Sequence, residues 1–488
     1  MKTNKVYFST ILFILLLSFF FHHLKEEQSY KRFHQHLQGR PEITVESKQE
    51  FVTHLPLIEI DTQGQTIPGG RVLRLEGKLT ILDDFAPVLS KASIRDKNGV
   101  VNKLNNPPDK QLDVLVRYRG HSSRVFDKKS LKLRFVDDVG NQKDVSLAGM
   151  TPNDEWNLHG PFLDRTLIRN YLGYNISGEI MDYAPNVRYC ELILNGEYQG
   201  VYLIVENIDP GTGRIPLEKS DRRSKATPYI LVWDRSEKVK QKLNNFSYYT
   251  YQTGSSALDI KYPGRTRLTP EQVEYISNDI SRIEKILYSY DLGKYDEYLD
   301  RNSFAEYFII NEFFRNADAG KFSTYLYKDL RQKIKLCVWD FNNCCDNYAD
   351  LAYSPSGFTM QDTPWFSMLL KDRKFVELVI NKYHVLRKTT LSTPYLLDYI
   401  DDTRDFLGPS IDRNNDKWGY VFLKKNRNPL NYLLPYKRNM KSYDESIEQL
   451  KGFITRRGEW LDQNIESLYQ YCAPSKNSNT LLDPGGLQ

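Results

Sequence analysis

The sequence is poor in cysteine and lacks any cysteine pattern that binds metal. Only five cysteines occur among 488 residues, and no two of them have the C-x-x-C spacing of zinc sites. Because five is an odd number, at least one thiol is free in a monomer, and the adjacent Cys344 and Cys345 cannot bridge each other without strain. We therefore expect buried core thiols rather than a disulfide framework or a zinc site.

The sequence also lacks the lysine and arginine blocks that bind nucleic acid. Its net charge of +5 is spread over the chain, and short pairs such as Arg222–Arg223 and Arg456–Arg457 are typical of a solvated loop and a helix face. Repeats and low-complexity segments are missing too. With 40% hydrophobic and 26% charged residues, the chain has a globular composition and is long enough for two or three packed units. No nucleic-acid partner is expected.

The N-terminus has the pattern of a targeting segment. Lys2 and Lys5 precede an uncharged run at residues 6–21, which as a helix is roughly 24 Å long, against about 30 Å for a bilayer core. Three phenylalanines end the run, and no small-x-small cleavage site is present. We expect an uncleaved, single-pass signal anchor over residues 1–24 rather than a cleaved signal peptide, then a linker over residues 25–50. A body outside the cytoplasm is the usual outcome, although similar basic flanks leave the orientation open.

The first part of the body has the patterns of β-structure. Short apolar runs predict strands at residues 57–60, 79–82 and 114–119. Residues 131–135 alternate apolar with basic side chains, as in a strand with one buried face. Residues 190–206 predict a β-hairpin, because an Asn-Gly pair at its centre tolerates the positive φ angles of a tight turn.

The later part of the body has helical patterns. Thr269-Pro270 predicts a helix start, followed by an apolar stripe through Leu287. Ser303 and Glu306 have the spacing of a capping box that opens a second helix, and residues 450–465 predict a third. These patterns divide the chain into a β-rich part at residues 51–265, a mainly helical part at residues 266–470 and a disordered tail at residues 471–488.

Two aspartates flank a predicted hairpin in the helical part. Asp318 follows a helix, residues 323–327 and 334–339 read as paired strands, and Asp340 comes directly after them. Pairing of the strands places both carboxylates at one end of the hairpin (residues 316–346). Magnesium is commonly held by one or two carboxylates plus phosphate oxygens, so the pair fits phosphoryl transfer, with Asp318 acting on the acceptor and Asp340 on the metal. The alternative is that both aspartates only cap local structure.

A second candidate lies at Arg119-Gly120-His121-Ser122-Ser123 and the lysines that come after it. A strand leading into a Gly/Ser turn can offer backbone N–H groups to phosphates, and Lys128, Lys129 or Lys132 could reach the same oxygens. The segment has one glycine and no Walker A pattern, so an ordinary β-turn remains the alternative.

An ordered series of motifs resembles the CotH kinase family, named for a spore coat protein. The resemblance covers roughly residues 55–468. Its landmarks are Arg119-Gly120-His121-Ser122-Ser123, Lys128-Lys129, Trp156-Asn157-Leu158, Asp164 through Arg169-Asn170, Tyr183-Ala184-Pro185, Leu194 through Tyr202 with Glu206, Asn316-x-Asp318, Tyr325-Leu326-Tyr327 and Trp339-Asp340-Phe341. Each motif is weak alone, and the ordered set is specific.

The resemblance implies an α+β, two-lobed fold like that of atypical protein kinases, with a β-rich N-terminal lobe and a helical C-terminal lobe. It implies ATP- and Mg²⁺- or Mn²⁺-dependent transfer to a serine or threonine of a protein, here of a coat or envelope protein. Asp318 is then the catalytic residue. The expected metal residues are Asp340, Asn342 and Ser323, and the expected nucleotide-binding residues are Gly120, Ser122, Ser123, Lys129, Lys132 and Glu206.

Two positions depart from the family pattern. Ser323 stands where the family usually has an asparagine, and Asn342 stands where it often has an aspartate. Both side chains can ligate magnesium, but they do so without charge. The alternative function is therefore a catalytically weak or inactive kinase-like protein that mediates interactions at a surface or spore envelope. A carbohydrate-processing enzyme is a third possibility, but no better-placed carboxylate pair supports it.

Overall fold

The structure, a computed structural model, describes residues 31–41, 43, 50–69, 71–75, 78–82, 86–97, 99–120, 122–236, 239–241, 243–246, 256–289, 293–349, 351–423 and 429–473. The chain separates into two units, Met1–Phe33 and His34–Gln488, and the second unit contains the folded body. The predicted anchor at residues 1–24 lies outside the described residues, as do residues 474–488 of the predicted tail. Across the described ranges, no helix is long and apolar enough to cross a membrane.

Seven strands close into a β-barrel in the order β10-β11-β9-β8-β7-β5-β2. They are β2 (Leu57–Asp61), β5 (Val88–Arg95), β7 (Lys110–Arg119), β8 (Ser130–Val136), β9 (Glu155–His159), β10 (Val187–Leu194) and β11 (Glu197–Glu206). All neighbours are antiparallel except β2 and β10. The alternation predicted for residues 131–135 is confirmed, because Leu131, Leu133 and Phe135 are buried in the barrel core.

The predicted Asn-Gly hairpin is β10–β11, and this prediction is confirmed. Asn195 and Gly196 have φ angles of 52° and 78°, as a tight turn between twisted strands requires. Two further strand pairs lie outside the barrel: β1 (Val52–Thr53) with β6 (Asn102–Lys103), and β3 (Arg71–Leu75) with β4 (Lys78–Leu82).

A four-stranded antiparallel sheet forms the second β-unit, in the order β13-β12-β14-β15. Its strands are β12 (Tyr229–Arg235), β13 (Ser256–Tyr262), β14 (Thr324–Lys328) and β15 (Lys335–Cys337). The sheet thus joins strands from both sides of residue 265. β14 and β15 are the predicted hairpin, with Leu326 paired with Leu336.

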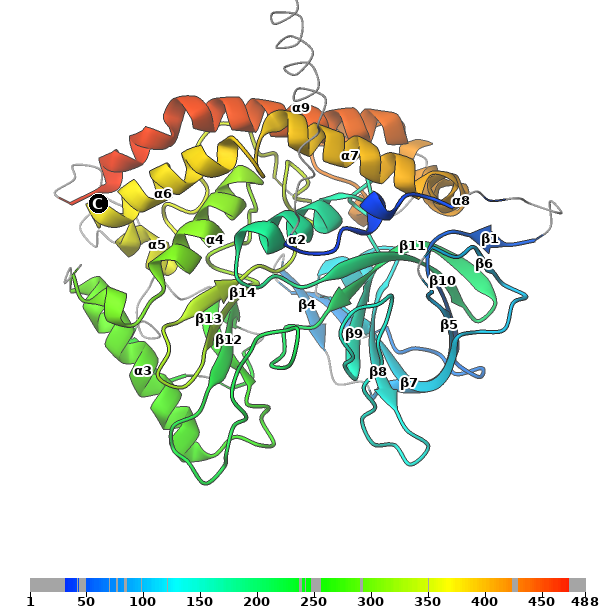
Figure 1. The fold of residues 1–488 in the computed structure, drawn as a ribbon, viewed down its shortest axis with the longest axis horizontal. Coiled ribbons are helices and arrows are strands. Elements are labelled where there is room, and N and C mark those ends of the chain that lie inside the picture. Colours follow the sequence, from blue (N-terminus) through cyan, green and yellow to red (C-terminus); the bar gives the residue numbers. More distant parts are fainter. Residues whose placement is uncertain are drawn as a thin grey trace, which may run out of the picture. The chain divides into compact units, whose positions relative to one another are not determined.

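The described helices lie mainly in the second half of the chain: α2 (Arg169–Ile180), α3 (Pro270–Tyr288), α4 (Arg301–Phe313), α5 (Pro364–Leu369), α6 (Arg373–Arg387), α7 (Thr393–Leu407), α8 (Pro409–Trp418) and α9 (Tyr443–Asn464). Figure 1 shows α6, α7 and α9 above α2 and α4, with the barrel and the four-stranded sheet beneath. The expected α+β class, β-rich first and helical later, is confirmed at this level.

The helix starts were predicted with mixed success. The predicted helix start at Thr269-Pro270 is confirmed, because Thr269 caps α3, and the structure adds a capping box with Gln272. The capping box proposed for Ser303 and Glu306 is wrong: Asp300 caps α4 by accepting from the Ser303 amide, and the Ser303 hydroxyl accepts from the backbone of Leu336.

A short segment of the predicted linker packs on the body. The 3-10 helix η1 (Gln35–Gln38) comes directly after His34, and His34, Gln35 and His36 are buried. The Gln35 side chain exchanges hydrogen bonds of 2.6 and 3.3 Å with the backbone of Tyr189 on β10. This segment is therefore part of the folded body.

Candidate active site at the open end of the β14–β15 hairpin

Asp318 and Asp340 lie at the same end of the β14–β15 hairpin and interact electrostatically. Asp318 lies in the turn after α4, and Asp340 comes after β15. The side chain of Asn343 donates to Asp318 Oδ2 at 2.8 Å, and the side chain of Asn316 donates to the Asp340 carbonyl at 3.1 Å. The two loops are therefore joined, and the carboxylates share one environment.

The surroundings of Asp340 favour its protonated form. Burial raises the pKa of its carboxyl above the ordinary value, and the neighbouring negative charge of Asp318 raises it further. Arg119, on the barrel, opposes this effect. A cation held between the two carboxylates would relieve their repulsion, so the pair has the electrostatics of a cation site.

The backbone is unusual around this pair. Ten described residues other than glycine have a positive φ, and five of them lie near the site: Arg315, Ser323, Asp340, Cys345 and Asp346. Such conformations are costly and tend to gather at functional sites. Besides the bond from Asn316 to its carbonyl, Asp340 forms two further hydrogen bonds that hold its conformation: its amide donates to the Tyr174 hydroxyl at 3.1 Å, and its Oδ1 accepts from the Asn342 amide at 3.1 Å.

The two other predicted metal residues differ in their surroundings. Asn342 Oδ1 accepts from the side chain of Asn170 at 2.6 Å, so the amide oxygen has a fixed orientation beside Asp340. The Ser323 side chain forms no hydrogen bond with any residue in the described ranges. Its neighbour Thr324 instead shapes the turn, by accepting from the Gly320 amide and donating to the Phe322 carbonyl.

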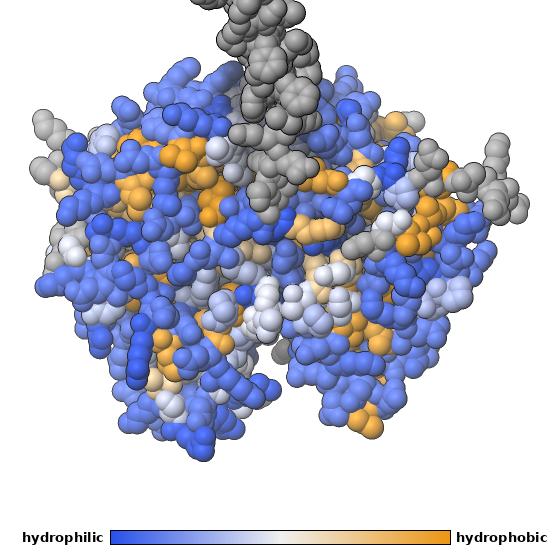
Figure 2. Space-filling view, in the orientation of Figure 1, coloured by the Kyte–Doolittle hydropathy of each residue, from blue (hydrophilic) through white to orange (hydrophobic). Residues whose placement is uncertain are grey.

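The side chain of Arg119 connects the barrel to the residues after the hairpin. It is the last residue of β7, and its guanidinium carbon lies 5.4 Å from the ring centroid of Trp339, next to Asp340. Among the described residues it forms no salt bridge, so its N–H groups can bind an anion. Figure 2 shows the surface hollowed between the barrel and the four-stranded sheet, at the bottom of the view.

Gly120 and Ser123 form a tight turn directly after Arg119. Gly120 has a φ of 100°, and a Cβ there would lie 1.9 Å from Ser123 Oγ, so only glycine fits. Ser122 begins the 3-10 helix η2 (Ser122–Val125), and its side chain lies outside the described set. The predicted bend therefore exists, and the residue that precedes it, Arg119, acts electrostatically on Asp340.

The two predicted phosphate-reaching lysines are engaged elsewhere. Lys129 Nζ donates to the Arg124 carbonyl at 2.6 Å and so closes its own loop. Lys132 forms a salt bridge with Glu155 on the neighbouring strand. The barrel cation that acts on Asp340 is thus Arg119, not a lysine.

Glu206 is buried at the end of β11, and only one of its two carboxylate oxygens forms hydrogen bonds with described residues. Its Oε2 accepts from the amide and the side chain of Asn186, at 2.8 and 3.1 Å. Its Oε1 is buried and has no partner within the described residues, which is costly for a carboxylate. One oxygen therefore remains for a donor that the described residues do not supply.

Several residues at the site were given no role on sequence grounds. Arg119 and Asn170 stand inside motifs that carry the family resemblance, which is the signal that could have selected them. Tyr174 and Asn343 carried no signal, because a lone tyrosine or asparagine is common. Arg235, whose Nη2 lies 3.7 Å from Asp318 Oδ1, comes from a distant strand and is found only through the fold.

The site joins paired carboxylates to an arginine across two β-units, an arrangement suited to binding a cation and an anion together. The sequence matches the family described as "CotH kinase protein" over residues 116–461. The chain belongs to this CotH kinase family. It is also 21% identical over 384 residues to "Inner spore coat protein H" of Bacillus subtilis (strain 168), covering 78% of this chain and 94% of that protein.

Proposed function

We propose that this protein is an atypical, two-lobed kinase of the CotH type that transfers the γ-phosphoryl group of ATP to a serine or threonine of a protein. The observation that supports the proposal most is the shared environment of Asp318 and Asp340, with Arg119 opposite them. We further propose that the acceptor is a coat or envelope protein, since the similar Bacillus subtilis protein is named as a spore coat protein.

The residues present fit a magnesium ion. The two carboxylates are close enough for Asp318 to raise the pKa of Asp340, and the oriented amide oxygen of Asn342 adds a third hard donor. No group of three or more His, Cys, Asp or Glu side chains in the described part of the chain could hold a metal. That fits magnesium, which one or two carboxylates and phosphate oxygens can bind. Magnesium, when bound, would neutralise charge on the phosphates.

Each charged side chain then has a distinct task in the transfer. Asp318 Oδ2 accepts from Asn343, and Oδ1 lies 3.7 Å from Arg235 Nη2, beyond hydrogen-bond distance, so Oδ1 can orient the acceptor hydroxyl and take its proton. The hydroxyl oxygen forms a bond to the γ-phosphorus while the bond from that phosphorus to the β–γ bridging oxygen breaks, and ADP leaves. Arg119 binds phosphate oxygens, because a guanidinium offers several donors in a fixed fork. Glu206 Oε1 accepts a hydrogen bond from the nucleotide.

The alternative is a kinase-like protein without turnover, which acts by binding partners at a surface or spore envelope. The uncharged Asn342 and the engaged Lys129 and Lys132 favour it. Both functions allow a membrane-anchored location with the body outside the cytoplasm, which we propose from the apolar run at residues 6–21. Deleting residues 1–24 should then release the protein from the membrane fraction.

A transfer assay separates the two functions. The protein is incubated with γ-labelled ATP, Mg²⁺ or Mn²⁺ and spore coat extract, alongside Asp318→Asn, Asp340→Asn and a matched control, Asp398→Asn, on the exposed face of α7. We expect label with the wild type and the control, and none with the two site variants. Nucleotide binding without label would support the inactive alternative, and label that persists in both site variants would contradict the proposed mechanism.

A further inference from the structure

Helix α2 binds the first three residues of the loop that carries Asp340 (residues 340–347, the Asp340 loop). Asn170 accepts from the Phe341 amide at 2.8 Å and donates to Asn342 Oδ1 at 2.6 Å. Tyr174, one turn later on the helix, accepts from the Asp340 amide at 3.1 Å. Three consecutive loop residues thus take their hydrogen-bond partners from a single helix.

Phe341 lies directly against the backbone of α2. The ring is fully buried, and a Cβ at Gly173 would lie 2.3 Å from it. Non-bonded heavy atoms do not approach this closely, so the ring can occupy this place only beside a glycine. The contact fixes the distance between the helix and the Asp340 loop.

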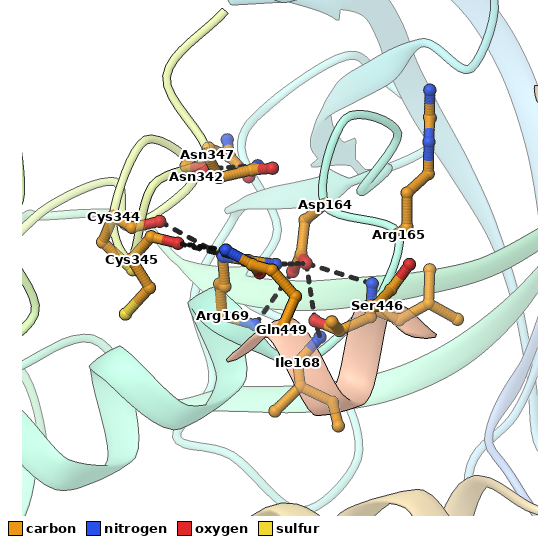
Figure 3. Close-up of polar contacts among 12 residues, drawn as sticks. Asp164, Arg165, Ile168, Arg169, Asn342, Cys344, Cys345, Asn347, Ser446 and Gln449 are labelled. Atoms are coloured by element: carbon orange, nitrogen blue, oxygen red, sulfur yellow. Dashed lines mark hydrogen bonds and ion pairs between the residues drawn. The ribbon is translucent and has the colours of Figure 1, made fainter. Parts of the chain in front are cut away.

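The far end of the Asp340 loop is also held from α2, through Arg169. Its Nε and Nη2 donate to the carbonyls of Cys344 and Cys345, both at 3.2 Å. Asp164 fixes the guanidinium by accepting from Nη1 at 2.7 Å, and Nη2 donates to Gln449 of α9 at 2.7 Å. Figure 3 shows Arg169 between Asp164 on one side and the two carbonyls on the other.

The Asp340 loop needs this support because its own backbone is unfavourable. Asp340, Cys345 and Asp346 all have positive φ angles between 51° and 61°. Residues other than glycine avoid this region unless the surroundings impose it. The contacts from α2 reach residues at both ends of the strained segment.

We infer that α2 is the template that sets the geometry of the Asp340 loop, and that Asn170 is its positioning residue. Asn170 acts through Phe341 and Asn342, because its amide fixes the direction of the Asn342 oxygen beside Asp340. Partners of this kind commonly tune metal affinity about 10–100-fold without touching the ion. The consequence for metal binding rests on the proposed function, whereas the control of loop geometry does not.

Asparagine substitutions on α2 test the inference with a matched control. Asn170→Ala removes the contacts to the loop. Asn175→Ala removes an equally buried asparagine of the same helix, whose side chain donates to Tyr399 of α7. Hydrogen exchange of the Phe341 amide and Mn²⁺ affinity in the presence of ATP are measured for both variants and the wild type.

We expect Asn170→Ala to speed Phe341 exchange at least about tenfold and to weaken Mn²⁺ binding by roughly 10–100-fold. Asn175→Ala should leave both close to wild type, even if its melting temperature falls. Equal effects of the two substitutions on loop exchange, or no effect of Asn170→Ala on it, would overturn the inference. If the wild type binds no Mn²⁺, the proposed function fails, and the exchange result alone decides the inference.

A tyrosine pair repeats the test with a smaller change that keeps the fold. Tyr174→Phe removes the acceptor for the Asp340 amide, whereas Tyr171→Phe removes a hydroxyl of the same helix that contacts His36. Only Tyr174→Phe should speed exchange of the Asp340 amide, by roughly fivefold. The same response in both variants would contradict a template role for α2.

Discussion

At position 342 the chain carries an amide where a charged ligand would bind a metal more strongly. Asn342 Oδ1 already accepts from Asn170 and lies beside a carboxyl whose pKa is raised. An amide at this position adds no third negative charge to a buried site in which Asp318 and Asp340 already repel each other. If the proposed metal site is correct, the amide lowers metal affinity and reduces charge repulsion in the metal-free protein.

Asn342→Asp should strengthen metal binding and lower the thermal stability of the metal-free protein. We expect Mn²⁺ affinity to rise roughly tenfold, because a carboxylate replaces a neutral oxygen, and the melting temperature without metal to fall. Isothermal titration with Mn²⁺ and thermal unfolding with and without metal check both effects. Unchanged affinity would mean that residue 342 does not face the ion.

Arg119 should set the pH range in which the site binds metal. It opposes the rise in the pKa of Asp340 that burial and Asp318 cause, so Arg119→Met should raise that pKa further. Metal competes with the proton on Asp340, and therefore the loss of Mn²⁺ binding on acidification should begin at a higher pH in the variant. Mn²⁺ titrations between about pH 5 and 8 measure this, with Arg117→Met on the same strand as the control. A shift to lower pH would contradict the assignment.

At the scale of elements, buried histidines should make the body sensitive to acid. Burial lowers the pKa of His36, in η1, and of His159, on β9, to about 3, and that of His54 to about 4. The unfolded chain takes up these protons near about pH 6.5, so stability is fully present above that pH and falls as the pH drops toward about 3–4.

Each of these histidines should cost about 2 kcal/mol of unfolding free energy at pH 5 relative to pH 8. His36→Asn should therefore flatten the pH dependence by about that amount. Urea unfolding of the wild type and His36→Asn at these two pH values tests this. For each protein, the change in unfolding free energy between the two pH values reports the difference in proton uptake between the folded and unfolded states. An equal pH dependence in both proteins would show that His36 is protonated in the folded state.

The β10–β11 hairpin is fastened to α8 at a point that only glycine allows. Gly200 has a φ of 103°, and a Cβ there would lie 2.6 Å from Asn414 Oδ1 and 3.0 Å from Trp418 Nε1. Gly196, in the turn of the same hairpin, also has a positive φ but has no atom within 4 Å of such a Cβ.

Alanine substitutions at the two glycines should separate the cost of backbone strain from the cost of steric contact with α8. Gly196→Ala should cost about 1 kcal/mol for its backbone alone, and Gly200→Ala about 3 kcal/mol, because the contact with α8 must also move. Urea unfolding compares the two variants. Equal losses would show that the hairpin and α8 are not tightly coupled.

Local sequence patterns predicted individual strands and helices, whereas contacts between residues distant in sequence determine how these elements assemble. The alternation at residues 131–135 and the Asn-Gly turn depend on neighbours in sequence, so they could be predicted. The closure of the barrel by parallel β2 and β10 could not, because nothing local marks that pairing. Helix α2 has no amphipathic pattern, because the residues from Arg169 to Gly178 are all buried. The sequence therefore could not predict that this helix contacts the Asp340 loop.

At the scale of the whole molecule, the proposed activity depends on two β-units meeting at one charged site. The barrel supplies Arg119, the loop after the last strand of the four-stranded sheet supplies Asp340, and the turn after α4 supplies Asp318. Sequence predicted the acidic pair because a hairpin brings its ends together. It could not identify Arg119 as the partner cation, because that choice depends on how the barrel meets the sheet.

Metal-dependent nucleotide binding by the two aspartate variants tests the role of the acidic pair most directly. ATP affinity is measured with and without Mn²⁺ for the wild type, Asp318→Asn and Asp340→Asn. We predict that Asp340→Asn abolishes the Mn²⁺-dependent part of binding, while Asp318→Asn keeps it and loses phosphoryl transfer. Mn²⁺-dependent binding that survives in Asp340→Asn would contradict the claim that this carboxylate binds the ion.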